Sequence, residues 1–259
     1  NRTFYSSYFT MKIALLISGQ PRRHREGYQE LKKWFLDKYD IDVYLHAWKD
    51  TEFKKYDFFN EGKVQKTYEV NDDLYQNLLD WYQPKGFLFE PSIQFDASGL
   101  KGPNNQRLNS QMGMWMSTYR SFQLCEESGI EYDLVFKTRY DLLFTHYAAN
   151  DCDLLTDITQ LDPDRLHFWE YAPHWNMDWQ INDQLAIGKP ELVKQYCSVF
   201  PEMLFNIFHN PEYRDNNDDI FINETLVLQH IKNLNIPLSP MYHGFGGSRG
   251  IDCGCHIMR

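Results

Sequence analysis

The sequence predicts an α/β fold with a mostly parallel central sheet and helices on both faces, a Rossmann-like architecture. Three runs of strand length, 12–18, 41–46 and 132–137, are almost continuously apolar, which is typical of strands buried on both faces. Segments with helical spacing of apolar residues alternate with such runs, and this alternation favours parallel pairing. The chain has 259 residues, 42% of them hydrophobic, enough for the core of one large domain.

The individual elements follow from local patterns in chain order. The first strand, at 12–18 (KIALLIS), ends at a Gly-Gln-Pro triplet, and a helix should follow at 25–38, where apolar residues recur on one face. Further strands are expected at 41–46, 86–90, 132–137 and 166–171. Further helices are expected at 72–82, from Asn109 or Ser110 to about 128, at 190–200 and at 219–234. Residues 91–108 and the tail from 239 have no regular period.

Composition excludes several classes of function. Lys and Arg total 26 against 36 Asp and Glu, a net charge of −10, so we expect no nucleic-acid partner. No stretch is long and apolar enough for a transmembrane segment, and a cytoplasmic location is favoured, with peripheral membrane attachment or a lumenal location left open. The phosphate loop, zinc-protease helix and nucleophile elbow are absent. Aromatic residues, at 16%, suit either a sugar-binding cleft or a Tyr-rich core.

Ligands of open α/β sheets bind beyond the carboxyl ends of the strands. The segment SGQPRR at 18–23 follows the first strand. Its glycine allows close approach of a ligand to the backbone, and its arginines are suited to phosphate oxygens. The alternative is a tight turn with two solvated arginines. The candidate binding residues here are Ser18, Gly19, Gln20, Arg22 and Arg23.

A second candidate site follows the strand at 132–137, in the sequence TRYD. A carboxylate at this position, Asp141, is well placed to hold Mg²⁺ or Mn²⁺ between two phosphates. The alternative is that Asp141 caps a turn or pairs with Arg139.

The segment 175–184 mixes indoles, amides and carboxylates, the groups that bind sugar rings and their hydroxyls. Asp183 is the candidate general base toward an acceptor hydroxyl, or else the cap of a helix. Farther on, His243 in YHGFGG has the chemistry of a metal ligand, although a lone histidine is more often a polar surface residue. The candidate sugar-binding residues are Trp175, Trp179, Asn182 and Gln184.

The order of four segments resembles the nucleotide-sugar-dependent glycosyltransferases of the GT-A fold, and is similar to small bacterial and large-DNA-virus enzymes that build surface polysaccharides. These segments are SGQPR, DVYLHAW, YDLVFKTRYDLLF and NDQLAIGKPELVKQY, and the resemblance covers most of 11–236. It implies an enzyme that moves a sugar from a UDP- or GDP-linked donor to a glycan hydroxyl. We expect a leader or tag-like segment at 1–10 and one GT-A-like domain at 11–259, with a donor half at about 11–145 and an acceptor half at about 146–259.

The family's Asp-x-Asp motif implies a Mn²⁺ or Mg²⁺ cofactor, and this chain departs from that motif. Asp141 matches the second acid, but Arg139 stands at the first position. Arg139 can itself neutralise phosphate, which would leave the metal weakly bound or absent, and His243 matches a late metal ligand of some families. Two alternatives stay open: a nucleotide-sugar-binding protein without catalysis, and a sugar nucleotidyltransferase.

Overall fold

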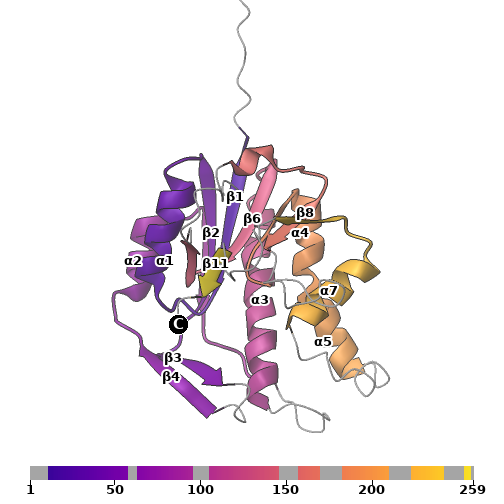
Figure 1. The fold of residues 1–259 in the computed structure, drawn as a ribbon. Coiled ribbons are helices and arrows are strands. Elements are labelled where there is room, and N and C mark those ends of the chain that lie inside the picture. The colour runs from indigo at the N-terminus through magenta and orange to yellow at the C-terminus, as the bar shows by residue number, and fades with distance from the viewer. Residues whose placement is uncertain are drawn as a thin grey trace, which may run out of the picture.

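The computed structural model describes residues 11–57, 63–95, 105–145, 157–169, 183–209, 223–241 and 254–257. Its centre is a seven-stranded sheet (Figure 1). The strands of this sheet are β1 (Ile13–Gly19), β2 (Ile41–Trp48), β5 (Gly86–Glu90), β6 (Leu134–Arg139), β8 (Leu166–Trp169), β9 (Ala186–Gly188) and β10 (Leu238–Met241). They lie side by side in the order β10-β8-β9-β6-β1-β2-β5.

Pairing in this sheet is parallel except at one strand. β1 pairs in parallel with β2 and with β6, β2 pairs in parallel with β5, and β8 with β10. β9 runs antiparallel to both of its neighbours, β6 and β8. The three apolar runs of the sequence therefore form adjacent strands of one sheet, which confirms the predicted α/β class with a mostly parallel central sheet.

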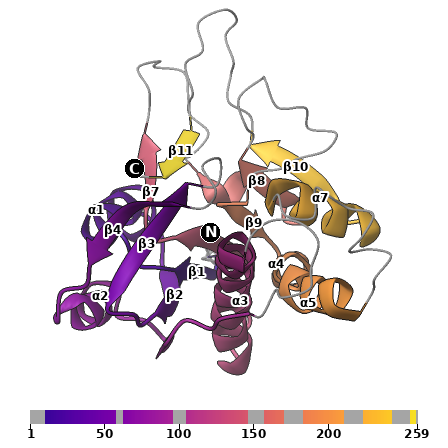
Figure 2. The ribbon, with the colours of Figure 1, turned by 90° about the horizontal axis from the view of Figure 1, so that it is seen from below.

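Helices cover both faces of the sheet. They are α1 (His24–Leu31), α2 (Leu74–Tyr82), α3 (Asn105–Glu127), α4 (Pro190–Cys197), α5 (Val199–His209) and α7 (Asn223–Asn233). Alternate residues of β1 belong to different core layers, because side chains of a strand point alternately to its two faces. Ile13, Leu15 and Ile17 pack with residues of α1 and α2, whereas Ala14 and Leu16 pack with residues of α3, α4 and α7. Figure 2 shows α1 and α2 on one side of β1 and β2 and α3 on the other.

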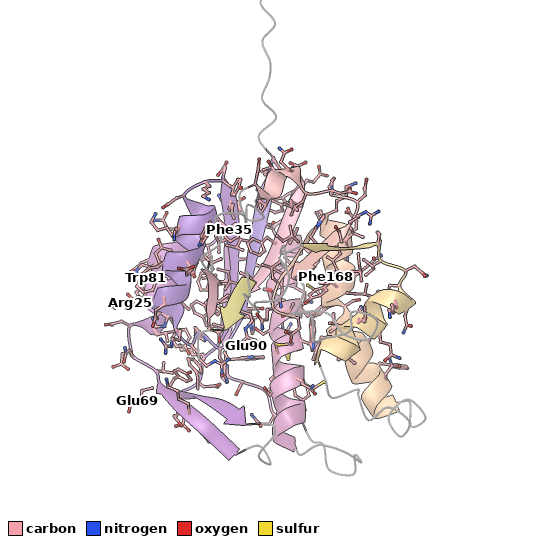
Figure 3. All side chains as sticks on the ribbon, viewed as in Figure 1. Arg25, Phe35, Glu69, Trp81, Glu90 and Phe168 are labelled. Carbon is pink, nitrogen blue, oxygen red and sulfur yellow. The ribbon has the colours of Figure 1, made fainter. Side chains whose placement is uncertain are left out.

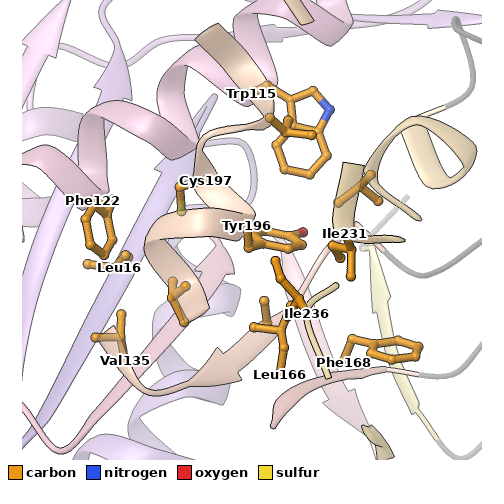
Figure 4. Close-up of a cluster of buried hydrophobic side chains, with 14 of the residues drawn as sticks. Leu16, Trp115, Phe122, Val135, Leu166, Phe168, Tyr196, Cys197, Ile231 and Ile236 are labelled. Carbon is orange, nitrogen blue, oxygen red and sulfur yellow. The ribbon is translucent and has the colours of Figure 1, made fainter. Parts of the chain in front are cut away.

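Each core layer is built around fully buried aromatic side chains. On the α1 side, Phe35 packs edge-to-face against Phe136 of β6, with ring centroids 4.7 Å apart. On the α3 side, the ring centroids of Trp115 and Tyr196 lie 5.4 Å apart (Figure 4). Figure 3 labels Phe35 in the first layer and Phe168 in the second. Burial of each such side chain contributes roughly 1.5–3 kcal/mol, so both layers hold the sheet in place.

Two small sheets were not expected from the sequence. β3 (Glu52–Asp57) pairs antiparallel with β4 (Lys63–Glu69), and β7 (Leu142–Thr145) pairs with β11 (Gly254–Ile257). The first is a hairpin so rich in charged residues that it has no apolar run. The second joins segments more than a hundred residues apart in the sequence, a pairing that no local pattern reveals.

Helix boundaries differ from the expected ones in three places. The helix expected at 25–38 is α-helical to Leu31 and then continues as a π-helical turn, η1 (Lys32–Leu36). The helix expected at 190–200 is two helices, α4 and α5. The expected cap of α3 at Asn109 or Ser110 is wrong, because α3 begins at 105 and the Asn109 side chain instead bonds the backbone of Phe95. None of the described helices has the length and apolarity needed to cross a bilayer.

Candidate active site

The carboxyl edge of the sheet brings predicted site residues from separate segments together. Ser18, at the end of β1, is in register with His46 of β2 on one side and with Arg139 of β6 on the other. Because β9 runs antiparallel, its first residues lie at this same edge. Lys137 of β6 is opposite Ala186 of β9, so the segment just before β9, which contains Gln184, enters the sheet beside the end of β6.

Asp141 lies just beyond β6 and pairs with two arginines. Arg139 Nε donates to Asp141 Oδ1 at 2.9 Å, and Arg139 Nη2 donates to Oδ2 at 3.1 Å. Arg22, from the turn after β1, donates through Nη2 to Oδ2 at 3.1 Å. Arg22, Arg139 and Asp141 therefore lie together, whereas the printed ion pair of Arg23 is with Glu26. The alternative reading, in which Asp141 pairs with Arg139, is realised.

Burial and charge act in opposite directions on this cluster. The Asp141 side chain is only 2% exposed, and burial alone would raise its pKa. The charges of Arg139 and Arg22 and the hydrogen bonds of Arg139 outweigh burial, so the pKa of Asp141 lies below its ordinary value. Burial lowers the pKa of Arg22, while the charge of Asp141 opposes that shift. The cluster therefore carries two cations on one anion, a net positive charge in an acidic chain.

The described residues do not fit a divalent cation at Asp141. Both of its oxygens accept hydrogen bonds from arginine, so a metal ion would have to displace these bonds and approach two cations. Within the described ranges, no group of three or more His, Cys, Asp or Glu side chains is arranged to hold a metal. His243, the other predicted ligand, lies outside the described residues. Dependence of the protein on Mn²⁺ or Mg²⁺ stays a prediction.

A groove of about 280 Å³ opens beside this cluster. Its wall includes the turn 21–24, the start of α1 and the β3–β4 hairpin, which sequence reasoning did not connect with the site. Two cations lie over the ring of Tyr68 of β4: Lys66 Nζ is 4.8 Å and Arg22 Cζ is 6.0 Å from its centroid. Arg22 Nε is buried and has no hydrogen-bond partner among the described residues. The groove therefore offers an aromatic face and cationic groups side by side.

The turn after β1 is fixed by helix α3. Gly19, with a φ of +113° that favours glycine, donates its N–H to Ser117 Oγ at 2.7 Å. Ser18 is buried, and its hydroxyl lies 3.2 Å from that of Thr118. Arg23 pairs with Glu26 at 3.1 Å, away from Asp141, and the carbonyl of Gln20 accepts from the backbone of Arg22. Roles of Ser18, Gly19, Gln20 and Arg23 in binding stay predictions.

The same network contains a histidine that was not among the candidate site residues. His46 of β2 is fully buried, with Nδ1 2.6 Å from Ser117 Oγ and Nε2 3.0 Å from Glu90 Oε1 (Figure 3 labels Glu90). Because the Glu90 carboxylate can only accept, Nε2 donates to it. In the neutral ring Nδ1 then accepts from the Ser117 hydroxyl. Burial lowers the pKa of His46 to about 4, although Glu90 opposes the shift. His46 is therefore neutral near pH 7.

Asp183 and Gln184 lie at the entrance to β9, both nearly buried. The Asp183 carboxylate makes no hydrogen bond or ion pair with any other described residue. The carbonyl of Asp183 accepts from Lys137 Nζ at 2.6 Å and from the Tyr196 hydroxyl at 3.2 Å. Three predicted sugar-binding residues lie outside the described residues: Trp175, Trp179 and Asn182.

Comparisons with known proteins find likeness in structure. No family model and no curated protein matches the sequence. A solved structure with a similar fold is the apo form of the glycosyltransferase GlyE of Streptococcus pneumoniae TIGR4, with a TM-score of 0.43 and 11% identity. The match covers 89% of this chain but 45% of that chain, so this chain spans less than half the length of that protein. A likeness of this size does not establish an activity, which has to follow from the residues of the site.

Proposed function

We propose that this protein is a glycosyltransferase that uses a nucleoside diphosphate sugar as donor and neutralises its diphosphate with Arg22 and Arg139. The observation that carries the proposal is the arginine pair held by the buried Asp141 at the carboxyl edge of the sheet. Arginine binds phosphate oxygens through two parallel N–H groups, and fixing its side chain in advance lowers the entropy cost of binding.

The chemistry needs such a positive site. When the bond between the sugar's anomeric carbon and the diphosphate oxygen breaks, the leaving diphosphate takes the electron pair and gains negative charge. Two arginines oriented by one carboxylate keep a net positive charge, and each is partly accessible, with side-chain exposures of 17% for Arg22 and 16% for Arg139. Preorganised cations stabilise developing charge without reorganising during the reaction. The arginines thus supply what a metal ion supplies in other enzymes.

The groove beside the arginines suits the nucleoside end of such a donor. Its volume, about 280 Å³, is near the lower end of ligand sites. The ring of Tyr68 provides a flat surface for a base, and Lys66 and Arg22 flank it with positive charge. A nucleotide seated there would direct its phosphates toward the Arg22 side of the cluster.

Asp183 is the proposed general base on the acceptor side. Its carboxylate has no partner among the described residues, and it enters the sheet next to the end of β6. In the proposed step it takes the proton of the acceptor hydroxyl as the acceptor oxygen bonds to the anomeric carbon. The donor side and the acceptor side of the edge then carry different chemistry: cations on one and the Asp183 carboxylate on the other.

Release of nucleoside diphosphate from a panel of UDP- and GDP-sugars tests the proposal, measured in the presence of chelator and again with Mn²⁺. We expect release by the wild type in chelator, and a loss on the order of tenfold to a hundredfold in Arg139→Met, because a hydrogen bond to a charged group contributes roughly 1.5–3 kcal/mol. Arg165→Met is the matched control, since Arg165 is half-exposed and pairs with Asp162 before β8.

Each outcome of this assay has a distinct meaning. Release that requires Mn²⁺ would restore the predicted metal cofactor and overturn the role of the arginines. Binding of donor without any release would identify a nucleotide-sugar-binding protein without catalysis. Loss of activity in Arg165→Met equal to that in Arg139→Met would contradict the assignment of the site.

A further inference from the structure

Lys137 is a charged side chain buried completely inside the fold. It lies on β6, between β1 and β9, and its exposed fraction is 0%. Removing an ammonium group from water costs several kcal/mol unless the protein provides compensating partners. The partners of this ammonium group therefore indicate why a lysine stands here.

The ammonium group is held by backbone oxygens and aromatic rings. Nζ donates to the carbonyl of Asp183 at 2.6 Å and lies 3.5 Å from that of Gln184. It also lies 5.7 Å from the ring centroid of Trp115 and 5.8 Å from that of Tyr196, within the range of cation–π attraction. The Tyr196 hydroxyl donates to the same Asp183 carbonyl. Figure 4 shows Trp115 and Tyr196 adjacent in this core layer.

The segment that receives these bonds precedes a very short strand. β9 has only three residues, Ala186–Gly188, so its ladder holds the preceding residues weakly. Among the described residues, the Asp183 carboxylate has no hydrogen-bond or ion-pair partner. Within the described part of the chain, the bonds to its main chain are therefore the contacts that position it.

We infer that Lys137 is a positioning residue, which fixes the backbone of Asp183 and Gln184 and so aims the Asp183 carboxylate at the carboxyl edge of the sheet. The catalytic consequence rests on the proposed function; the anchoring does not. Lysine suits this task because its flexible stem reaches two successive carbonyls from the neighbouring strand, and its three N–H donors serve both.

The test compares Lys137→Met with the wild type in two measurements. Methionine keeps the length of the side chain and suits the aromatic surroundings. We expect calorimetric affinity for UDP or GDP, whichever the wild type binds, to change less than about twofold, because the arginine cluster is intact. Turnover should fall on the order of tenfold to a hundredfold, the effect of a misplaced catalytic group. Hydrogen exchange of the amides of Gln184 and Leu185, read by mass spectrometry, should accelerate.

Two more variants sharpen the result. Tyr196→Phe removes the second bond to the Asp183 carbonyl and should shift exchange and turnover in the same direction by less. Lys194→Met is the control, because Lys194 is exposed on α4 and pairs with Glu126; it should match the wild type in every measurement.

Several outcomes would overturn the inference. One is wild-type exchange and turnover in Lys137→Met. Another is a parallel loss of donor affinity and turnover, which would mean general damage rather than positioning. If Lys137→Met does not fold, hydrogen exchange of the wild type still tests the anchor. Rapid exchange of its Gln184 and Leu185 amides would show that nothing anchors them. If the wild type releases no nucleotide from any donor, the proposed function fails, while the exchange measurement still decides the anchor.

Discussion

Asp141 orients two arginines at once, and this double pairing determines its effect on stability. Asp141→Asn keeps the shape of the side chain but leaves Arg22 and Arg139 close together without a counter-charge. Breaking a buried pair in this way costs about 3–5 kcal/mol, so we expect the free energy of unfolding in urea to fall by that order. The control is Asp164→Asn, because Asp164 is largely exposed where it pairs with Lys189. Equal stability of Asp141→Asn and the wild type would show that the buried pairing does not form in solution.

His46 gives the protein a pH-dependent stability with a definite sign. Its pKa is about 4 in the folded protein and near 6.5 when unfolded. Between these pH values the unfolded chain binds more protons than the folded protein. The stability that neutral His46 contributes is therefore complete above pH 6.5 and is lost as pH falls toward 4. The full effect is about 3 kcal/mol.

Urea denaturation at several pH values measures this effect. In His46→Gln, whose amide can still donate to Glu90 and accept from Ser117, the decline in stability between pH 6.5 and 4 should be shallower than in the wild type by about that amount. Identical slopes in the two proteins would contradict a buried, neutral His46.

At the scale of elements, helix α1 is packed directly on the loop that carries Asp141. A Cβ added at Gly27 would lie 1.7 Å from the carbonyl oxygen of Tyr140, so Gly27→Ala must push α1 away from that loop. Overpacking of this kind costs about 1–3 kcal/mol, and the shift should also weaken donor binding. Gly113→Ala is the control: its Cβ would meet only Trp48, at 3.8 Å, and we expect unchanged or slightly higher thermal stability. A fully stable Gly27→Ala would disprove the close packing.

Elements with a strong local pattern could be predicted, and those that depend on distant partners could not. The strands β1, β2 and β6 were evident because both of their faces are buried, so apolar residues fill nearly every position. β9, with three residues, is too short for any period to show. β11 exists only through pairing with β7, far away in the sequence. The β3–β4 hairpin has charged side chains in place of apolar ones, and so looks like a loop.

At the scale of the whole molecule, topology explains why the site could be predicted in part. The rule that ligands bind at the carboxyl ends of strands places Arg22, Arg139 and Asp141 together, and the structure does so. It does not tell which groups pair with each other. Arg22 and Asp141 are 119 residues apart in sequence. The packing of the folded chain, and not a local sequence pattern, buries the ion pair that they form. Nor does any motif mark Lys137, whose role depends on rings from α3 and α4.

In the proposed function, the arginine pair binds a nucleoside diphosphate without help from a metal ion. Calorimetric titration of the wild type with UDP, UMP, GDP and GMP in chelator tests this binding, with Arg22→Met and the control Arg165→Met alongside. We expect one diphosphate to bind at least about tenfold more tightly than its monophosphate, since the second phosphate gains charge-assisted bonds. Arg22→Met, but not Arg165→Met, should remove this difference. Equal affinity for monophosphate and diphosphate, or diphosphate binding that appears only with Mn²⁺, would contradict it.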